Sequence, residues 1–366
     1  MTNNSSSDYT ILIGDEVFSE ISNFISGERY VNNSIFILVD ENTNNFCHPL
    51  LIDNIEKLRK AEIIEIKSGE ENKSIEVCSQ IWQRLGDSGA DRRSLLINLG
   101  GGVIGDMGGF IASTYKRGID FINVPTTLLS QVDASIGGKV GINLNNLKNQ
   151  VGVFNNPKAV FVYPGFLKTL NKRHLLSGFA EVVKHGLITD YSFWNEIKRD
   201  FLNLQDLGNL GSAIWENIII RSIQIKNNIV LKDPWEQGLR KVLNFGHTIG
   251  HALESDSLEN DKIPLLHGEA VAIGMICESY LSCKVSGLSQ VELEEITSFI
   301  LSVFDQHQIE INTDKELIEL MKQDKKNEIE KINFTLLSKS GKAVINQNCN
   351  DELICEALGF YRQKII

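Results

Sequence analysis

The sequence predicts an α/β domain with a parallel sheet, followed by a mostly helical domain. Short apolar runs alternate with helical patterns in the first half, which is typical of a parallel sheet built from βα units. From about residue 170 the strand pattern stops, and apolar residues recur at helical spacing. The length of 366 residues favours about two domains. We expect domains at 1–170 and 171–366, joined by a hinge in residues 164–172, with a cleft between them.

Composition excludes several classes of protein. The net charge of −11 argues against binding to nucleic acid or to an anionic membrane surface. No apolar run approaches the ~18 residues that a membrane span needs, and the polar start does not resemble a signal peptide. The six cysteines form no CxxC pair, as expected for reduced thiols in the cytosol. We therefore expect a cytoplasmic protein that binds a small molecule.

The first half contains a series of strands that end in polar residues. Residues 9–25 predict a strand, a turn and an amphipathic helix. The run 34–42 is apolar and ends in Asp-Glu-Asn, the pattern of a buried parallel strand. Residues 61–74 repeat this pattern before a helix at 75–87. Ligands of such sheets bind beyond the carboxyl ends of the strands, where these polar groups fall.

A glycine-rich segment at 100–106 follows an apolar strand and opens an apolar helix. Glycines let a backbone approach a pyrophosphate, and a helix N-terminus offers free N–H groups. The segment contains GxGxxG, but the ribose-binding acid expected about 20 residues later is missing. Asp40 is the better candidate for the ribose hydroxyls. The alternative interpretation is a tight turn from strand to helix with no ligand.

Helical periodicity dominates the second half, at 173–229, 242–286 and 291–307. One apolar run at 332–337 fits either a strand or a loop.

Three histidines suggest a metal site in this half. His247 and His251 stand four apart, on one helical face, and His267 precedes the next helical run. Catalytic zinc usually takes three protein ligands from histidines and carboxylates. The alternative is that these are buried histidines of a helical core. Glu236, Arg240 and Asn244 precede them at spacings that predict one polar stripe on a single helix.

Two further groups of charges need an explanation. Glu181 lies three residues before Lys184 and four before His185 on a predicted helix with apolar neighbours. An exposed salt bridge is the ordinary explanation, whereas partial burial would call for a partner or a metal. Lys139, Lys148 and Asn149 lie near glycines and could approach an anion or belong to plain loops.

The motifs GGGVIGDMGGF, YKRG, VPTTLLSQVDASIGGKVGIN, GFAEVVK, LNFGHTIGHALE and LHGEAVAIGM occur in this order. Together they closely resemble the 3-dehydroquinate synthase family of sugar-phosphate cyclases, over roughly residues 35–345. The resemblance implies a Rossmann-like NAD-binding domain, a helical domain that binds metal and substrate, and a homodimer. It implies a lyase of the shikimate pathway, which leads to the aromatic amino acids.

The implied reaction converts 3-deoxy-D-arabino-heptulosonate 7-phosphate to 3-dehydroquinate and phosphate. Its steps are transient oxidation by NAD, phosphate elimination, re-reduction and an intramolecular aldol closure. Three alternatives remain: another sugar-phosphate cyclase, a metal-dependent polyol dehydrogenase, and a non-catalytic metabolite-binding protein.

The resemblance also assigns residues. The metal, zinc with cobalt as the alternative, would be held by Glu181, His247 and His267, which moves His251 to the substrate. NAD would contact Asp40, Asn42, Glu70, Lys73, Gly101, Gly102, Asp106, Thr126, Thr127, Lys139, Lys148, Phe166 and Thr169. The catalytic and substrate residues would be Arg117 from the partner subunit, Asp133, Lys139, Asn149, Lys184, Lys226, Glu236, Arg240, Asn244, His251 and Lys342. The chain departs from the family in having His185 where a tyrosine is expected.

Overall fold

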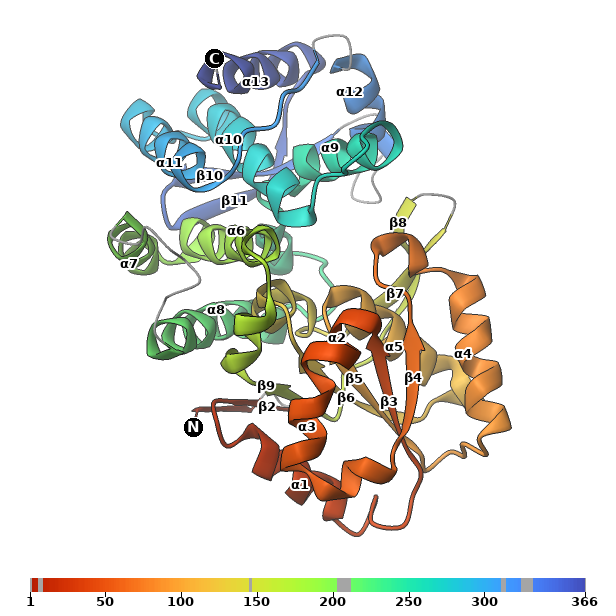
Figure 1. Cartoon of the computed structure of the whole chain (residues 1–366). Coiled ribbons are helices and arrows are strands. Elements are labelled where there is room, and N and C mark those ends of the chain that lie inside the picture. The colour runs from red at the N-terminus through yellow and green to blue at the C-terminus, as the bar shows by residue number, and fades with distance from the viewer. Residues whose placement is uncertain are drawn as a thin grey trace. The chain divides into compact units, whose positions relative to one another are not determined.

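The computed structural model of the protein describes residues 2–5, 9–144, 147–202, 212–310, 314–323 and 332–365 (Figure 1). It forms two compact units, one of Met1–Asn171 with Gly208–Asn227 and one of Lys172–Leu207 with Asn228–Ile366. The predicted domains at 1–170 and 171–366 differ from these units in the segment Gly208–Asn227. That segment belongs with the first unit because, for example, Lys226 donates to the Asp133 carbonyl oxygen at 2.6 Å. The division into independent domains stays a prediction.

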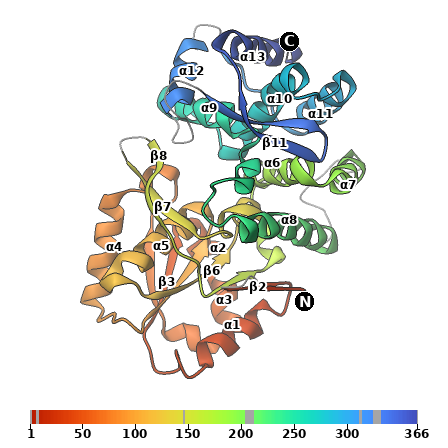
Figure 2. The same ribbon diagram turned by 180° about the vertical axis from the view of Figure 1, so that it is seen from behind.

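The first unit is built on a seven-stranded sheet in which six strands run parallel, as predicted (Figures 1 and 2). A short strand, β1, pairs antiparallel with β2 at one edge. In spatial order the strands are β1 (Thr2–Ser5), β2 (Thr10–Ile13), β9 (Ala159–Val162), β6 (Asp120–Pro125), β5 (Leu95–Gly100), β3 (Ile35–Asp40) and β4 (Glu62–Ile66).

Two apolar clusters cover the two faces of this sheet. Strand residues point alternately to opposite faces. Accordingly, Ile37 and Val39 of β3 pack into one cluster, and Phe36 and Leu38 pack into the other. The covering helices are α1 (Val17–Ser26), α3 (His48–Asn54), α4 (Ile75–Asp87) and α5 (Gly102–Thr114). The short helix α2 (Glu41–Phe46) directly follows β3. A sheet buried on both faces explains why its strands read as continuous apolar runs.

An antiparallel hairpin of β7 (Lys139–Leu144) and β8 (Leu147–Phe154) was not predicted from the sequence. Its apolar residues are interrupted by glycines, so the period-two pattern is weak. Val140 and Ile142 fix it to the unit by packing into the same cluster as α5. The hairpin carries Lys139, Lys148 and Asn149.

The second unit is mostly helical, as predicted, with a hairpin of β10 (Asn333–Lys339) and β11 (Lys342–Asn348). The run at 332–337 is therefore largely strand. The helices are α6 (Lys172–Thr189), α7 (Tyr191–Leu202), α9 (His247–Asn260), α10 (His267–Val285), α11 (Gln290–Val303), α12 (Asp314–Gln323) and α13 (Asp351–Lys364). The helix α8 (Ser212–Lys232) has residues in both units. No helix within the described ranges is both long and apolar enough to cross a membrane.

The prediction of one helical stripe from Glu236 to His251 was wrong. Glu236 has a left-handed backbone with φ 57°, and Arg240 and Asn244 lie in a separate 3-10 helix, η7 (Leu239–Asn244). Gly246, with φ 79°, interrupts the helical backbone a second time, so α9 begins at His247. Glycine adopts this left-handed backbone conformation without strain, and here it changes the direction of the chain just before the histidines.

The helix α10 touches the backbones of both α6 and α9. A Cβ added to Gly268 would lie 1.9 Å from the carbonyl oxygen of Ser177 on α6. A Cβ added to Gly274 would lie 2.0 Å from the carbonyl oxygen of Gly246, at the start of α9. These three helices therefore depend on glycine at their crossings.

We expect Gly268→Ala to lower the free energy of unfolding by about 1–3 kcal/mol, because the new methyl group forces two backbones apart. Gly359→Ala is the matched control, since a Cβ at Gly359 in α13 meets nothing within 4 Å. This control should be neutral or stabilising by up to about 1 kcal/mol. Denaturant unfolding of both variants measures the difference, and equal stabilities would contradict the close crossing.

Candidate functional site

Three helices of the second unit bring Glu181, His247 and His267 together. Glu181 of α6 is fully buried, and the two histidines are the first residues of α9 and α10. The Glu181 Oε1 atom lies 3.5 Å from Nε2 of His247 and 3.6 Å from Nε2 of His267. Two donors bound tetrahedrally to one zinc ion at about 2.1 Å would lie roughly 3.4 Å apart. The two distances from the carboxylate oxygen to the imidazole nitrogens therefore fit a shared metal ion.

The second ring nitrogen of each histidine is already engaged. Nδ1 of His247 lies 3.0 Å from the carbonyl oxygen of Phe245, and Nδ1 of His267 lies 3.2 Å from Oε2 of Glu254. When Nδ1 donates to these oxygens, the Nε2 lone pair is left to bind a cation. Metal-binding histidines generally show this arrangement. Glu254, which is buried on α9, was not predicted from the sequence as part of the site.

Burial lowers the pKa of His267, but the nearby Glu254 and Glu181 carboxylates raise it by more, to about 9. The two carboxylates thus favour a positive charge at this point.

His251 offers a second set of ligands. The ring centroid of His251 lies 5.1 Å from that of His247 and 5.8 Å from that of His267. Nitrogen atoms of the three histidines lie within 4.8 Å of one another, so they could also hold an ion. The two sets differ in whether Glu181 or His251 is the third ligand. A carboxylate would neutralise more of the charge of a divalent cation.

Two other predicted residues of α6 are more deeply buried than the sequence suggested. Lys184 is 1% exposed and forms an ion pair with Glu181, and His185 is 0% exposed. The ion pair is thus not the exposed salt bridge that is the ordinary explanation for such spacing. In this pair a buried ammonium group lies directly beside a buried carboxylate, so each compensates the burial of the other.

A loop before η7 positions Glu236, Arg240 and Asn244. The Asp233 carboxylate accepts N–H bonds from Gln237, Gly238 and Arg240 at 2.7–3.0 Å. Burial acts to raise the pKa of Asp233, but these three N–H donors lower it by more. Asn244 donates to Glu236 Oε1 at 3.0 Å. Asp233 was not predicted from the sequence, because a lone aspartate before a proline looks like an ordinary turn residue.

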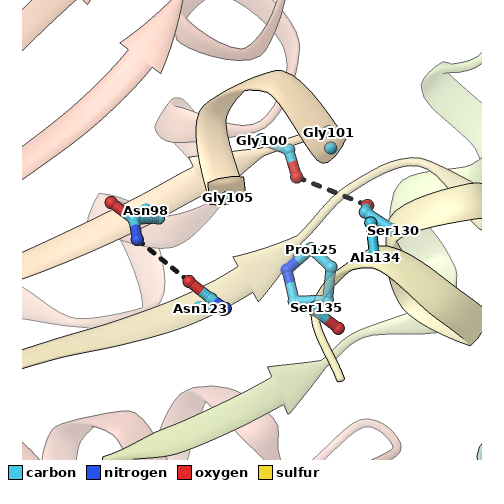
Figure 3. A pocket seen from close by; sticks show the side chains of 10 residues that line it. Asn98, Gly100, Gly101, Gly105, Asn123, Pro125, Ser130, Ala134 and Ser135 are labelled. Carbon is cyan, nitrogen blue, oxygen red and sulfur yellow. Dashed lines mark hydrogen bonds between the residues drawn. The ribbon is translucent and has the colours of Figure 1, made fainter. Parts of the chain in front are cut away.

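In the first unit, the glycine-rich turn lines a small pocket at the carboxyl ends of β5 and β6 (Figure 3). Gly101 is the N-cap residue of α5 and supplies no side-chain cap. The N–H groups of the first turn are therefore available to an anion. Asn98 donates a hydrogen bond to Asn123 at 2.9 Å beside this turn, drawn as a dashed line in Figure 3. The lining residues are Asn98, Gly100, Gly101, Gly102, Gly105, Asn123, Pro125, Ser130, Ala134 and Ser135.

A polar network in the first unit joins residues from several elements. Lys73 is buried and donates to Asp106 Oδ2 at 2.6 Å and to Asn149 Oδ1 at 2.5 Å. Glu70 accepts from Asn143 at 2.9 Å and lies 3.9 Å from the Lys148 ammonium. The structure thus gathers the predicted residues Glu70, Lys73, Asp106, Lys148 and Asn149.

The other predicted NAD and substrate residues differ in their contacts and in their exposure to solvent. Asp40 caps α2 by accepting the Thr43 N–H at 2.8 Å, and Asn42 is exposed on that helix. Lys226 forms an ion pair with Asp133 at 2.7 Å, and the Thr127 hydroxyl lies 2.9 Å from that of Ser130. Thr126 is buried, whereas Arg117, Lys139, Thr169 and Lys342 are exposed.

Phe166 is 0% exposed and packs into the apolar core of the first unit. In this structure Phe166 therefore offers no exposed surface to a cofactor.

Comparisons with known proteins agree over most of the chain. Residues 63–177 match the family described as "3-dehydroquinate synthase N-terminal", and residues 178–327 match "3-dehydroquinate synthase C-terminal". A 3-dehydroquinate synthase from Parabacteroides distasonis is 44% identical over 98% of this chain and 99% of the relative. The chain belongs to the 3-dehydroquinate synthase family.

Solved structures share the fold of this family. A 2-deoxy-scyllo-inosose synthase complexed with carbaglucose-6-phosphate, NAD+ and Co2+ has a TM-score of 0.84 at 23% identity, covering 99% of both chains. The 2-epi-5-epi-valiolone synthase of Streptomyces hygroscopicus, with NAD+ and Zn2+ bound, has a TM-score of 0.82 at 23% identity, also covering 99% of both chains. The predicted fold class is confirmed.

Substitution of single histidines separates the two ligand sets. If Glu181, His247 and His267 bind the metal, His247→Ala should lose the bound ion, whereas His251→Ala should retain about one equivalent. Metal content after gel filtration measures this. His307→Ala is a control, because His307 lies near Asp261 and outside both sets. Loss of the ion from His251→Ala with its retention by Glu181→Gln would favour the three-histidine set instead.

Proposed function

We propose that this protein is a 3-dehydroquinate synthase. It converts 3-deoxy-D-arabino-heptulosonate 7-phosphate to 3-dehydroquinate and phosphate, in the shikimate pathway. The observation that carries the proposal is the convergence of Glu181, His247 and His267 in a chain that belongs to this family over nearly its whole length. Such a site suits an enzyme that must bind a hydroxyl-bearing substrate to a cation.

The residues present fit a divalent metal ion. Glu181, His247 and His267 would hold it, and the engaged Nδ1 atoms of both histidines support that geometry. The expected ion is zinc, with cobalt as the alternative, in line with the ions named in the two solved cyclase structures. When bound, the cation would acidify a substrate hydroxyl as a Lewis acid.

The first unit would bind NAD. Gly101 and Gly102 at the start of α5 would face its phosphates, and Asp40 its ribose, with the other NAD residues named above around them. NAD would accept a hydride and later return it, so no NADH accumulates over a complete cycle. Both solved cyclases carry NAD+.

The substrate carries a phosphate and a carboxylate, and the chain offers cations for both. Lys139, Asn149, Asn244, His251 and Lys342 would bind the phosphate, with Arg117 supplied by a partner subunit. Lys184, Lys226 and Arg240 would hold the carboxylate and hydroxyls, with Asp133 and Glu236 completing the polar network. The bonds of Asp233 to the loop at 237–240 would hold Arg240 in place.

A homodimer and a cytoplasmic location complete the proposal. Arg117 lies in a turn where Lys116, Arg117 and Gly118 all have positive φ, and its side chain is exposed, which suits a residue offered to another subunit. Sedimentation of the purified protein tests the dimer, and cell fractionation tests the location.

The function is tested by incubating purified protein with the heptulosonate phosphate, NAD and zinc. We expect phosphate release that EDTA abolishes and added zinc restores, with 3-dehydroquinate formed and no NADH accumulating. His247→Ala should be inactive, because one ligand is lost. His307→Ala serves as the control and should keep its activity.

Two outcomes would change the proposal. Steady accumulation of NADH would indicate a metal-dependent polyol dehydrogenase. Turnover of glucose 6-phosphate or sedoheptulose 7-phosphate, but not of the heptulosonate phosphate, would indicate another sugar-phosphate cyclase.

A further inference from the structure

The helix that carries His247 has no cap of its own. Its N-cap residue is Gly246, which has no side chain to accept the N–H groups of the first turn. Unsatisfied N–H groups at a buried helix end are costly, so they usually find a partner elsewhere. His247 occupies the first position of this turn.

Glu278 of α10 supplies the missing acceptor. Its side chain is 0% exposed. Oε2 accepts the N–H of Gly246 at 2.6 Å, and Oε1 accepts the N–H of Ile249 at 3.1 Å. Ile249 is the third residue of α9, whose N–H an N-cap side chain normally binds. A carboxylate from another helix thus performs the capping, and the positive end of the helix dipole favours its charge.

The contact of Glu278 with Gly246 is linked to the ring of His247 through one peptide group. The Gly246 N–H and the Phe245 carbonyl belong to one peptide group. Glu278 binds the N–H side of this group, and Nδ1 of His247 binds the carbonyl side at 3.0 Å. A peptide group whose N–H donates to a carboxylate becomes a better acceptor at its carbonyl, because linked hydrogen bonds polarise one another.

We propose that Glu278 is a positioning residue for the metal site, acting on His247 through the Phe245–Gly246 peptide. The inference rests on the proposed metal site and goes beyond its ligands. It gives the two histidine ligands parallel support: Glu254 holds the His267 ring directly, and Glu278 holds the His247 ring through one peptide group.

The close crossing of α9 and α10 makes this contact possible. Gly274, one turn before Glu278 on α10, leaves room for the Gly246 carbonyl. The Glu278 side chain therefore reaches the start of α9 as part of a rigid backbone contact. It fixes both the position of His247 and the direction of its ring.

The test compares Glu278→Gln with Asn350→Ala. A glutamine keeps the shape but turns an NH2 group toward one of the two N–H donors, so one bond of the cap is lost. Asn350 is the matched control, because it caps α13 by accepting the Leu353 N–H at 3.0 Å and contacts none of the proposed ligands. Zinc affinity is measured by competition with a chelator, and the absorption spectrum of the cobalt form reports ligand geometry.

We expect Glu278→Gln to weaken zinc binding about 10–100-fold and to alter the cobalt spectrum, as changes behind metal ligands commonly do. Asn350→Ala should lower stability while leaving zinc affinity within about twofold of wild type. Unchanged zinc affinity and spectrum in Glu278→Gln, in a background where the wild type binds zinc, would overturn this inference alone. A wild type that binds no zinc would overturn the proposed metal site as well.

Hydrogen exchange on the wild-type protein gives a test that does not depend on a variant folding. Coupling between two sites is reciprocal, so metal binding at His247 should tighten the bonds to Glu278. We expect saturating zinc to slow amide exchange in a peptide covering residues 243–253, with no change in one covering 351–364. Equal exchange in the first peptide with and without zinc would contradict the proposed link.

Discussion

The burial of one carboxylate is the constraint on which the second unit depends. Glu181 is fully buried, and a buried charge is costly unless other charges or donors compensate it. Lys184 compensates it from the same helix, and His247 and His267 approach it from two others. The glycines at the helix crossings serve this arrangement, because only a close approach of α10 to α6 and α9 brings these side chains within reach.

The first unit satisfies a different constraint. Its parallel sheet is buried on both faces, so polar side chains can gather only beyond the strand ends. Gly100 of β5 and Pro125 of β6 stand in register there, beside the glycine-rich turn. Lys73, Asp106 and Asn149 form a hydrogen-bonded network from separate segments. The gathering of polar groups at this edge thus follows from the sheet architecture, with the unpredicted β7–β8 hairpin contributing Asn149.

Several structural expectations failed where the local backbone departs from a regular helix or strand. Glu236, Arg240, Asn244, His247 and His251 share helical spacing but lie on a turn, a 3-10 helix and an α-helix. Periodicity cannot reveal such breaks, because one left-handed glycine changes the direction of the chain without changing the spacing. The supporting carboxylates Asp233, Glu254 and Glu278 escaped prediction for a related reason. Their roles come from contacts with segments or backbone groups that spacing does not specify.

By itself the sequence determined the fold class, the two-part organisation of the chain and the motifs that carry its family. Those features depend on local apolar periodicity and on short residue patterns, both of which can be read from the sequence alone. The family resemblance named Glu181, His247 and His267 as one set, but only the tertiary structure decided how these side chains meet and what supports them: Glu254 contacts one ring, and Glu278 contacts the peptide behind the other. The physical reason is that these contacts join different helices, and they depend on helix crossings that local preference does not encode.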